Sequence, residues 1–297
     1  MPSRARVHLV RHAHGFHNLG YEFHALLDPR LTPLGESQCA TLQRTRFPPA
    51  SQSNISLVAA SPLCRTLHTA HLAFSPALRN GKAVPAILAV PDAQETSDDP
   101  CDTGSDVDVL HGICAEQGWR ADLSLVTEGW NIKTLDNRYS PASDAIKARA
   151  RDTRILLRQK AREFAQAGDE DIEIVLVAHG AYMHYITEDW EETDKFLGTG
   201  WENCECRTYT FESDFTADTD DQAYLVETME SRNRRGKEYP MHEHEKQKGM
   251  YLACMQAWED QGLQNPIKLG LPTVVPAHTT TDMMRLNRVT GEIQVMA

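Results

Sequence analysis

The fold is decided at the stretch Val7-His8-Leu9-Val10-Arg11-His12, where a short apolar run ends in two polar residues. Strands buried on both faces of a parallel sheet have this pattern. Four further strands are predicted along the chain, over residues 56–60, 83–90, 172–178 and 206–211. Pro85 interrupts the third of these five runs, which predicts an edge strand or an irregular one.

Segments with helical periodicity separate these strands. The clearest helix start is Leu31-Thr32-Pro33-Leu34-Gly35, where Thr32 can cap the helix and Pro33 suits its first position. Helices are predicted over residues 33–46, 63–74, 107–117, 143–166, 182–189 and 243–261. The alternation of short apolar strands with longer helices predicts a three-layer α/β/α sandwich with a mostly parallel sheet.

The chain of 297 residues is predicted to form a single domain, residues 1–297. Between about 91 and 143 the pattern loosens into turn-rich sequence, which indicates an insertion that caps one end of the sheet. From about 212 to 297 the composition becomes acidic and then mixed, which indicates a C-terminal extension.

Composition and charge narrow the classes of function. Lys and Arg total 30 and Asp and Glu total 42, so the net charge is −12. Because phosphate groups bind clustered positive charge, this balance argues against a nucleic acid or an anionic membrane as partner. No apolar run approaches the roughly 20 residues of a membrane helix, and seven scattered cysteines argue against a disulfide framework. We therefore expect a cytoplasmic enzyme or binding protein, whose oligomeric state (a homodimer included) the sequence leaves open.

Chemically distinctive residues follow the predicted strands. In chain order these residues are Arg11 and His12, then Arg65, then Glu95, then His179. In open α/β sheets, ligands bind outside the carboxyl ends of the strands. Four separate segments are therefore predicted to bring two histidines, two arginines and a glutamate into one pocket.

Such a pocket suits phosphoryl transfer. A phosphate monoester is a dianion whose oxygens match guanidinium groups, which stay charged at physiological pH. A neutral imidazole is a good nucleophile toward phosphorus and needs no metal or other cofactor. The leaving alkoxide needs a proton, which a carboxylic acid with a raised pKa can supply. The expected partner is a small phosphorylated metabolite.

The same residues lie in motifs that resemble the histidine phosphatase superfamily, whose members include the phosphoglycerate mutases. The matching segments are Leu9-Val10-Arg11-His12-Ala13-His14-Gly15-Phe16-His17-Asn18, Leu31-Thr32-Pro33-Leu34-Gly35, Ala60-Ser61-Pro62-Leu63-Cys64-Arg65-Thr66 and Val177-Ala178-His179-Gly180. Stretches that resemble a fungal-type branch are Gln94-Glu95-Thr96, Pro100-Cys101-Asp102-Thr103-Gly104-Ser105 and Gly198-Thr199-Gly200-Trp201. The resemblance covers residues 6–211 or so and implies a phosphoglycerate mutase-like fold.

The resemblance also implies a role for each pocket residue. His12 attacks phosphorus and becomes phosphohistidine. Arg11 and Arg65 bind the phosphoryl oxygens, and His179 donates to the same oxygens. Glu95 is the implied proton donor to the leaving group, and water then cleaves the phosphohistidine.

Three further residues are candidates for substrate binding. Asn18 and Thr32 are expected at the rim of the phosphate pocket. His184 has two interpretations, a substrate contact or a packed residue of the helix that follows His179. The segment His242-Glu243-His244-Glu245 is interpreted as a helix start rather than a metal site, because it lacks the spacing of a zinc motif.

Several functions are compatible with these residues. The first is a metal-independent phosphatase for a small-molecule phosphate monoester or diphosphate. The second is a repurposed scaffold that runs acid–base chemistry (isomerisation, dehydration or cyclisation) on an unphosphorylated metabolite of a biosynthetic pathway. A mutase ranks lower, because the insertion offers only Arg120, Lys133 and Arg138 as a second set of basic residues. A protein that captures phosphorylated ligands without turnover is the weakest alternative.

Overall fold

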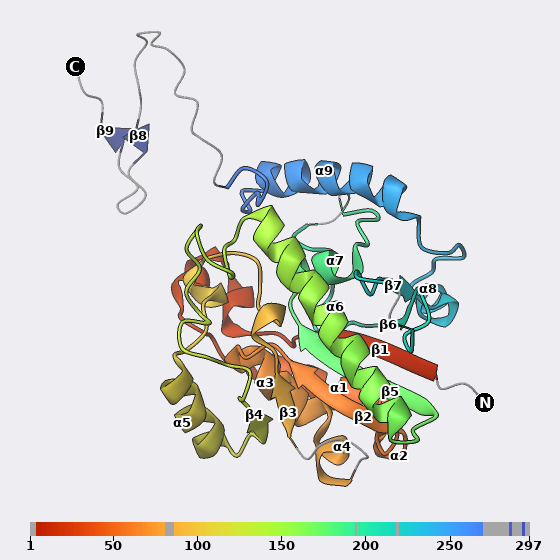
Figure 1. Cartoon of the computed structure of the whole chain (residues 1–297). Coiled ribbons are helices and arrows are strands. Elements are labelled where there is room, and N and C mark those ends of the chain that lie inside the picture. Colours follow the sequence, from red (N-terminus) through yellow and green to blue (C-terminus); the bar gives the residue numbers. More distant parts are fainter. Residues whose placement is uncertain are drawn as a thin grey trace.

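The computed structural model describes residues 4–80, 86–193, 195, 197–217, 220–269, 285–286 and 293–294. A seven-stranded sheet runs through this part of the chain, in the order β4-β3-β2-β5-β1-β6-β7 (Figure 1). Its strands are β1 (Arg4–Arg11), β2 (Ile55–Ala60), β3 (Ile87–Ala89), β4 (Ala121–Asp122), β5 (Asp171–Ala178), β6 (Cys206–Phe211) and β7 (Leu225–Glu227). A separate pair is β8 (Arg285–Leu286) and β9 (Ile293–Gln294).

The helices alternate with these strands along most of the chain. The α-helices are α1 (Pro33–Thr45), α2 (Pro49–Gln52), α3 (Cys64–Ala73), α4 (Ser75–Asn80), α5 (Val107–Gln117), α6 (Ser143–Gln166), α7 (Gly180–Thr187), α8 (Met229–Arg234) and α9 (His244–Asp260). Short 3-10 helices are η1 (Phe16–Leu19), η2 (Tyr21–Ala25), η3 (Pro91–Ala93) and η4 (Pro100–Asp102).

The sheet is parallel from β4 to β1 and antiparallel at β6 and β7. In the centre, β5 pairs with β1 on one side and with β2 on the other. Buried apolar residues fill all three of these strands, since helices cover both faces of the sheet. The predicted mostly parallel sheet is confirmed.

Two hydrophobic cores lie on the two faces of the sheet. Side chains of α6, α7 and α9 pack on the face that includes Val7 and Leu9 of β1, and α6 crosses in front of the sheet in Figure 1. Side chains of α1, α3 and α5 pack on the other face, with Val10. Alternate residues of β1 thus point to opposite cores, as the period of a strand requires. The arrangement is the predicted three-layer sandwich.

Most predicted elements form within two residues of the expected ends, and several details differ. The strand predicted over 83–90 is described as β3, with residues 81–85 outside the described part of the chain. Its interpretation as an edge strand is wrong, because β4 from the insertion pairs beyond it. The short elements α2, α4 and β4, and β7 and α8 in the predicted extension, were not predicted from the sequence. Finally, α7 begins at Gly180, two residues before the expected start.

The cysteines and the helix lengths bear on two further expectations from the sequence. All seven cysteines are free thiols, and five of them are buried. Over the residues that the structure covers, we find no helix with both the length and the apolar character to span a bilayer. The division into a single domain with a cap insertion and a C-terminal extension stays a prediction.

Candidate active site

The carboxyl ends of the parallel strands meet at one edge of the sheet, and a cavity of about 810 Å³ opens there. Arg11, His12, Arg65 and Glu95 all line this cavity, which we call the catalytic cavity. The ring of His179 lies beside that of His12, with 5.3 Å between the ring centroids. The structure therefore brings together the five residues that four separate segments were predicted to supply.

His12 follows β1, and hydrogen bonds to backbone carbonyl oxygens fix both its main chain and its ring. Its amide donates to the carbonyl oxygen of Ala178 at the end of β5, at 2.9 Å. Its ring Nδ1 lies 2.8 Å from the carbonyl oxygen of Ala13. Because a carbonyl oxygen only accepts, Nδ1 carries the hydrogen and Nε2 carries the lone pair. Burial and the nearby charge of Arg65 lower the pKa of His12 well below its usual value, so the ring is neutral.

Two arginines supply the positive charge of the catalytic cavity. Arg65, on α3, is fully buried and donates to a carboxylate oxygen of Asp102 at 2.8 Å. Arg11, at the end of β1, donates to the carbonyl oxygen of Trp201. Each guanidinium leaves its Nε–H buried with no acceptor among the described residues. Buried donors without acceptors are costly, and a bound oxyanion would supply the missing acceptors.

His179 stands between Arg65 and Ser61. Its Nδ1 accepts from the guanidinium of Arg65 at 3.0 Å, so its Nε2 carries the hydrogen and faces Ser61 Oγ at 2.9 Å. Burial and the charge of Arg65 lower the pKa of His179 well below its usual value. Donation from His179 to a phosphoryl oxygen would therefore replace the contact with Ser61.

Glu95 lies on the N-terminus of α7. One carboxylate oxygen accepts from the amides of Thr96 and Tyr182, both at 2.9 Å, and the other accepts from the amide of Ala181 at 3.2 Å. These amides favour the ionised carboxylate, whereas burial and the negative charge of Asp102 act against it. The net result is a raised pKa for Glu95, as a proton donor requires.

Two buried cations hold the backbone around Glu95. Arg149, in the middle of α6, donates to the carbonyl oxygens of Asp92 and Glu95 at 2.8 and 3.0 Å, and also to that of Gln94. Lys133, from the insertion, donates to the carbonyl oxygens of Glu95 at 2.8 Å and Ser97 at 2.6 Å. Burial lowers the pKa of Lys133 to about 7. Sequence reasoning assigned neither residue this role, because only the tertiary structure brings them to this loop.

The three candidate substrate-binding residues lie in different settings. Asn18 lines the catalytic cavity, and its side-chain oxygen accepts from the amide of Gly15 at 3.0 Å. His184 also lines it, but its two ring nitrogens lie 2.6 Å from the carbonyl oxygens of Asp189 and Thr199. His184 therefore joins α7 to the loop around residue 199, and its contact with substrate stays a prediction.

Thr32 caps α1 instead of lining the catalytic cavity: its hydroxyl accepts from the amide of Gly35 at 3.2 Å. We expect Thr32→Ala to lower the free energy of unfolding by about 1 kcal/mol, because an amide of the first turn loses its acceptor. Thr32→Ser keeps the hydroxyl and should keep the stability. Urea unfolding of both variants checks this, and equal losses in both would contradict the capping role.

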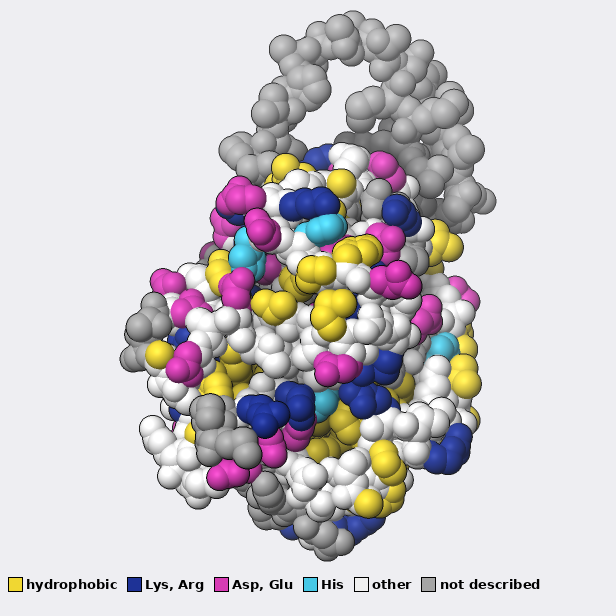
Figure 2. All heavy atoms as spheres, turned by 90° about the vertical axis from the view of Figure 1, so that its right-hand side faces the viewer, with side chains coloured by type: hydrophobic (Ala, Val, Ile, Leu, Met, Phe, Trp, Pro, Cys, Tyr) yellow, Lys and Arg dark blue, Asp and Glu magenta, His cyan; other side chains and the backbone are white. Residues whose placement is uncertain are grey.

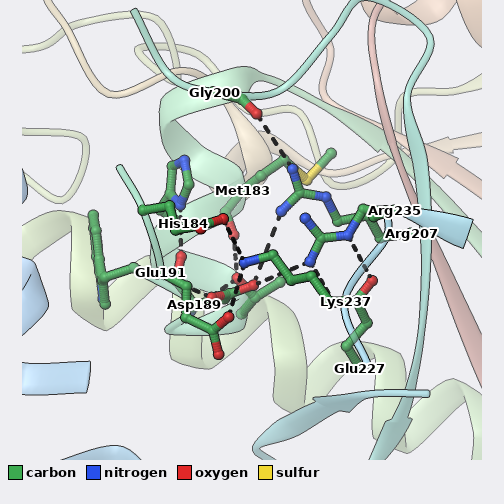
Figure 3. Close-up of polar contacts among 12 residues, drawn as sticks. Met183, His184, Asp189, Glu191, Gly200, Arg207, Glu227, Arg235 and Lys237 are labelled. Carbon is green, nitrogen blue, oxygen red and sulfur yellow. Dashed lines mark hydrogen bonds and ion pairs between the residues drawn. The ribbon is translucent and has the colours of Figure 1, made fainter. Parts of the chain in front are cut away.

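The far wall of the catalytic cavity is made of ion pairs (Figure 3). Arg235 contacts Glu227 at 2.6 Å and Lys237 contacts Glu191 at 2.9 Å. Arg207 lies 3.9 Å from Asp189 and stacks over the ring of Trp201 at 3.6 Å. Sequence reasoning missed this wall, because much of it comes from the extension, for which no motif was found.

One group of residues could hold a metal ion in the described part of the chain. Ligand atoms of His24, Asp99 and Cys101 lie within 4.8 Å of one another. His24 and Cys101 line the catalytic cavity. The phosphoryl-transfer chemistry derived from His12, Arg11 and Arg65 does not use this group.

The family model of the histidine phosphatase superfamily (branch 1) matches residues 7–88. Phosphoglycerate mutase-like protein 2 of Arabidopsis thaliana is 42% identical over 71 residues, or 22% of this chain and 21% of that protein. The phosphoglycerate mutase-like protein of Arabidopsis thaliana is 25% identical over 238 residues, or 68% of this chain and 82% of that protein.

Solved structures to which this chain is similar include the ecdysone phosphate phosphatase from Bombix mori in complex with tungstate. It has a TM-score of 0.45 and 15% sequence identity, and the match covers 73% of this chain and 95% of that one. The family match over residues 7–88 confirms the resemblance to the histidine phosphatase superfamily. The chain spans about a fifth (21%) of the length of the first of these relatives, phosphoglycerate mutase-like protein 2. The resemblance of this chain to a fungal-type branch stays a prediction.

Proposed function

We propose that this chain is a phosphatase that hydrolyses a phosphate monoester or diphosphate of a small molecule through a phosphohistidine, without a metal ion. Nε2 of His12 attacks phosphorus while the bond to the leaving oxygen breaks. Glu95 gives its proton to that oxygen. Water then attacks the phosphohistidine, the Glu95 carboxylate takes the proton of the water, and orthophosphate leaves with His12 restored.

The observation that carries the proposal is the state of His12. The contact between Nδ1 and the carbonyl oxygen of Ala13 leaves the lone pair on Nε2, and burial keeps the ring neutral. A nucleophile is thus ready without a separate base. Arg11 and Arg65 flank it with buried N–H groups that lack acceptors. Charge that builds on the phosphoryl oxygens would meet fixed donors, which is the main source of catalysis in phosphoryl transfer.

The positions of the basic residues favour a phosphatase over a mutase. Arg120, Lys133 and Arg138 were the candidates for a second anion-binding set, and none of them lines the catalytic cavity. Lys133 binds backbone carbonyls. Arg138 pairs with Asp92 and Asp152 at 2.5 and 2.7 Å. The described basic residues of the far wall pair with carboxylates, so a second phosphate group has no free cation to meet there.

Phosphate release from a panel of small phosphate esters and diphosphates, without added metal, tests the proposal. Release from at least one compound, together with an acid-labile phosphoprotein trapped from labelled substrate, is the expected result. Folded protein that releases no phosphate from any compound would contradict it. That outcome would favour the repurposed scaffold and a search among unphosphorylated metabolites. The cytoplasmic location expected from the sequence is a separate prediction.

The pH dependence of kcat/KM should have two limbs. The active form needs a neutral His12 and a protonated Glu95. Because the pKa of His12 is lowered, the acid limb should lie well below the usual histidine value of 6.5. Because the pKa of Glu95 is raised, activity should decline on the alkaline side only above the usual glutamate value of 4.5. A profile of kcat/KM for wild type beside Glu95→Gln checks the assignment, since the alkaline limb should vanish in the variant.

A further inference from the structure

A second cavity of about 350 Å³ lies at the opposite end of the sheet. Its lining includes His8 of β1, which is four residues and therefore about 13 Å along the strand from His12. Arg46, which follows α1, and Arg234, the last residue of α8, also line it. Figure 2 views this face of the molecule and shows Lys and Arg side chains on either side of a hollow with a histidine beside it. We call it the Arg46–Arg234 pocket.

The two arginines of this pocket converge on one hydroxyl group. Arg46 and Arg234 both donate to Oγ1 of Thr208, at 3.1 and 3.4 Å. Thr208 in turn faces Nδ1 of His8 at 3.1 Å, and Nε2 of His8 lies 2.6 Å from a carboxylate oxygen of Glu173. Since Nε2 donates to the carboxylate, Nδ1 accepts the hydroxyl hydrogen. The hydroxyl oxygen of Thr208 is therefore saturated by the two guanidinium groups.

Among the described residues, neither guanidinium has a counter-charge in contact with it. In the described part of the chain no carboxylate lies within 4.0 Å of Arg46 or Arg234. Nε of Arg46 is buried and has no acceptor there. Asp and Glu outnumber Lys and Arg by 42 to 30 in this chain, so carboxylates are abundant. Arg46 is half-buried and Arg234 is exposed, so both guanidinium groups can be reached by an anion from solvent.

The rest of the lining leaves the positive charge uncompensated at the centre. Two carboxylates, those of Glu173 and Glu230, belong to the lining. Glu173 is occupied by Arg6 at 2.7 Å and by His8. Glu230 lies on α8 with Arg234, outside ion-pair distance of it. Burial and the nearby charge of Arg46 lower the pKa of Arg234.

We propose that the Arg46–Arg234 pocket binds the phosphate group of a small soluble ligand, at a site separate from the catalytic cavity. Two guanidinium groups with a hydroxyl between them offer more donors than the two oxygens of a carboxylate use, and they suit the oxygens of a phosphate group. Ser51 also lines the pocket, with its hydroxyl donating to the carbonyl oxygen of Pro48 at 2.9 Å. The site does not depend on the proposed phosphatase reaction.

Calorimetric titration of the full chain with orthophosphate tests this site. Wild type should need two binding sites, the catalytic cavity and the Arg46–Arg234 pocket. The double variant Arg46→Gln and Arg234→Gln should lose one of them, with an affinity at least about tenfold weaker. Arg44→Gln is the matched control, because it removes the same charge from the last turn of α1 without touching the pocket. An unchanged isotherm in the double variant would overturn the proposal.

Two further arms separate this site from the catalytic one. Arg11→Gln should lose the other binding event and keep the one at Arg46 and Arg234. If the catalytic cavity binds no phosphate at all, wild type should still show a single event that the double variant abolishes. Titration with glycerol 3-phosphate distinguishes the sources, in His12→Ala, which should not hydrolyse it, and in His12→Ala combined with Arg46→Gln and Arg234→Gln. A binding event that only the combined variant loses assigns the site to phosphate esters, and an event lost with orthophosphate alone assigns it to the free ion. Thermal unfolding of each variant checks that it is folded.

Discussion

His12→Ala should reduce phosphate release at least about 10³-fold for every substrate that the wild type accepts. The reason is specific to this ring. Its Nδ1 is tied to the carbonyl oxygen of Ala13, so Nε2 is the one atom that can attack phosphorus. The neighbouring rings of His17 and His179 lie 5.2 and 5.3 Å away by centroid, and neither is placed to replace it.

Steady-state phosphate release measures this loss, and two controls make it specific. His111→Ala removes an exposed histidine from α5 and should leave the rate unchanged. Orthophosphate should still bind to the His12→Ala catalytic cavity, because Arg11 and Arg65 remain. A variant that is folded, binds phosphate and still releases it at the wild-type rate would remove His12 from the mechanism.

Glu95→Gln should slow the phosphorylation step by about 10²-fold to 10⁴-fold for alkyl phosphates, and much less for p-nitrophenyl phosphate. An alkoxide needs a proton as it leaves, whereas p-nitrophenolate is stable without one. Glutamine keeps the size of the side chain, and its one amide oxygen can still accept from the amide of Tyr182, whereas the contact with the amide of Ala181 is lost. The side chain is therefore expected to stay at the N-terminus of α7 with one hydrogen bond fewer.

The first turnover has to be measured by rapid mixing, because Glu95 also acts in the hydrolysis of the phosphohistidine. The burst of leaving group reports the phosphorylation step alone. Asp102→Asn is a useful companion, since it removes the negative charge that adds to burial in raising the pKa of Glu95, and it leaves the Glu95 carboxyl in place. Equal slowing of both substrate types by Glu95→Gln would show that the residue positions groups and does not donate a proton.

Much of the fold could be predicted from the sequence because its central strands are short buried runs between clear helices. The boundaries of α5 and α6 were expected where they occur, at 107–117 and 143–166. Strands of two or three residues, such as β4 and β7, carry too little pattern to be found. The start of α7 was placed two residues too late because Gly180 is a poor helix former. In the structure, the Glu95 carboxylate accepts from the amides of Ala181 and Tyr182 in the first turn of this helix.

The residues of the candidate site also fall into two groups, those that could be predicted from the sequence and those that only the structure reveals. Arg11, His12, Arg65, Glu95 and His179 were found because each follows a buried strand or lies in a motif. Asp102 lay in a quoted motif, but its ion pair with Arg65 appears only when the chain is folded. Arg149 lies in the middle of a long helix among other basic residues, and nothing in the sequence separates it from them.

The hydrogen bonds from Arg149 and Lys133 to the loop around Glu95 affect which residues of this loop can change during evolution. Both cations bind carbonyl oxygens of the loop, a group that every amino acid carries. Mutations at Asp92, Gln94 or Ser97 therefore leave the anchoring atoms in place, and neutral drift at these positions can erase the local signature while the acid stays where it is. Homologues of this chain should be recognised at this loop by a retained arginine and lysine far away in the sequence rather than by the residues that flank the glutamate.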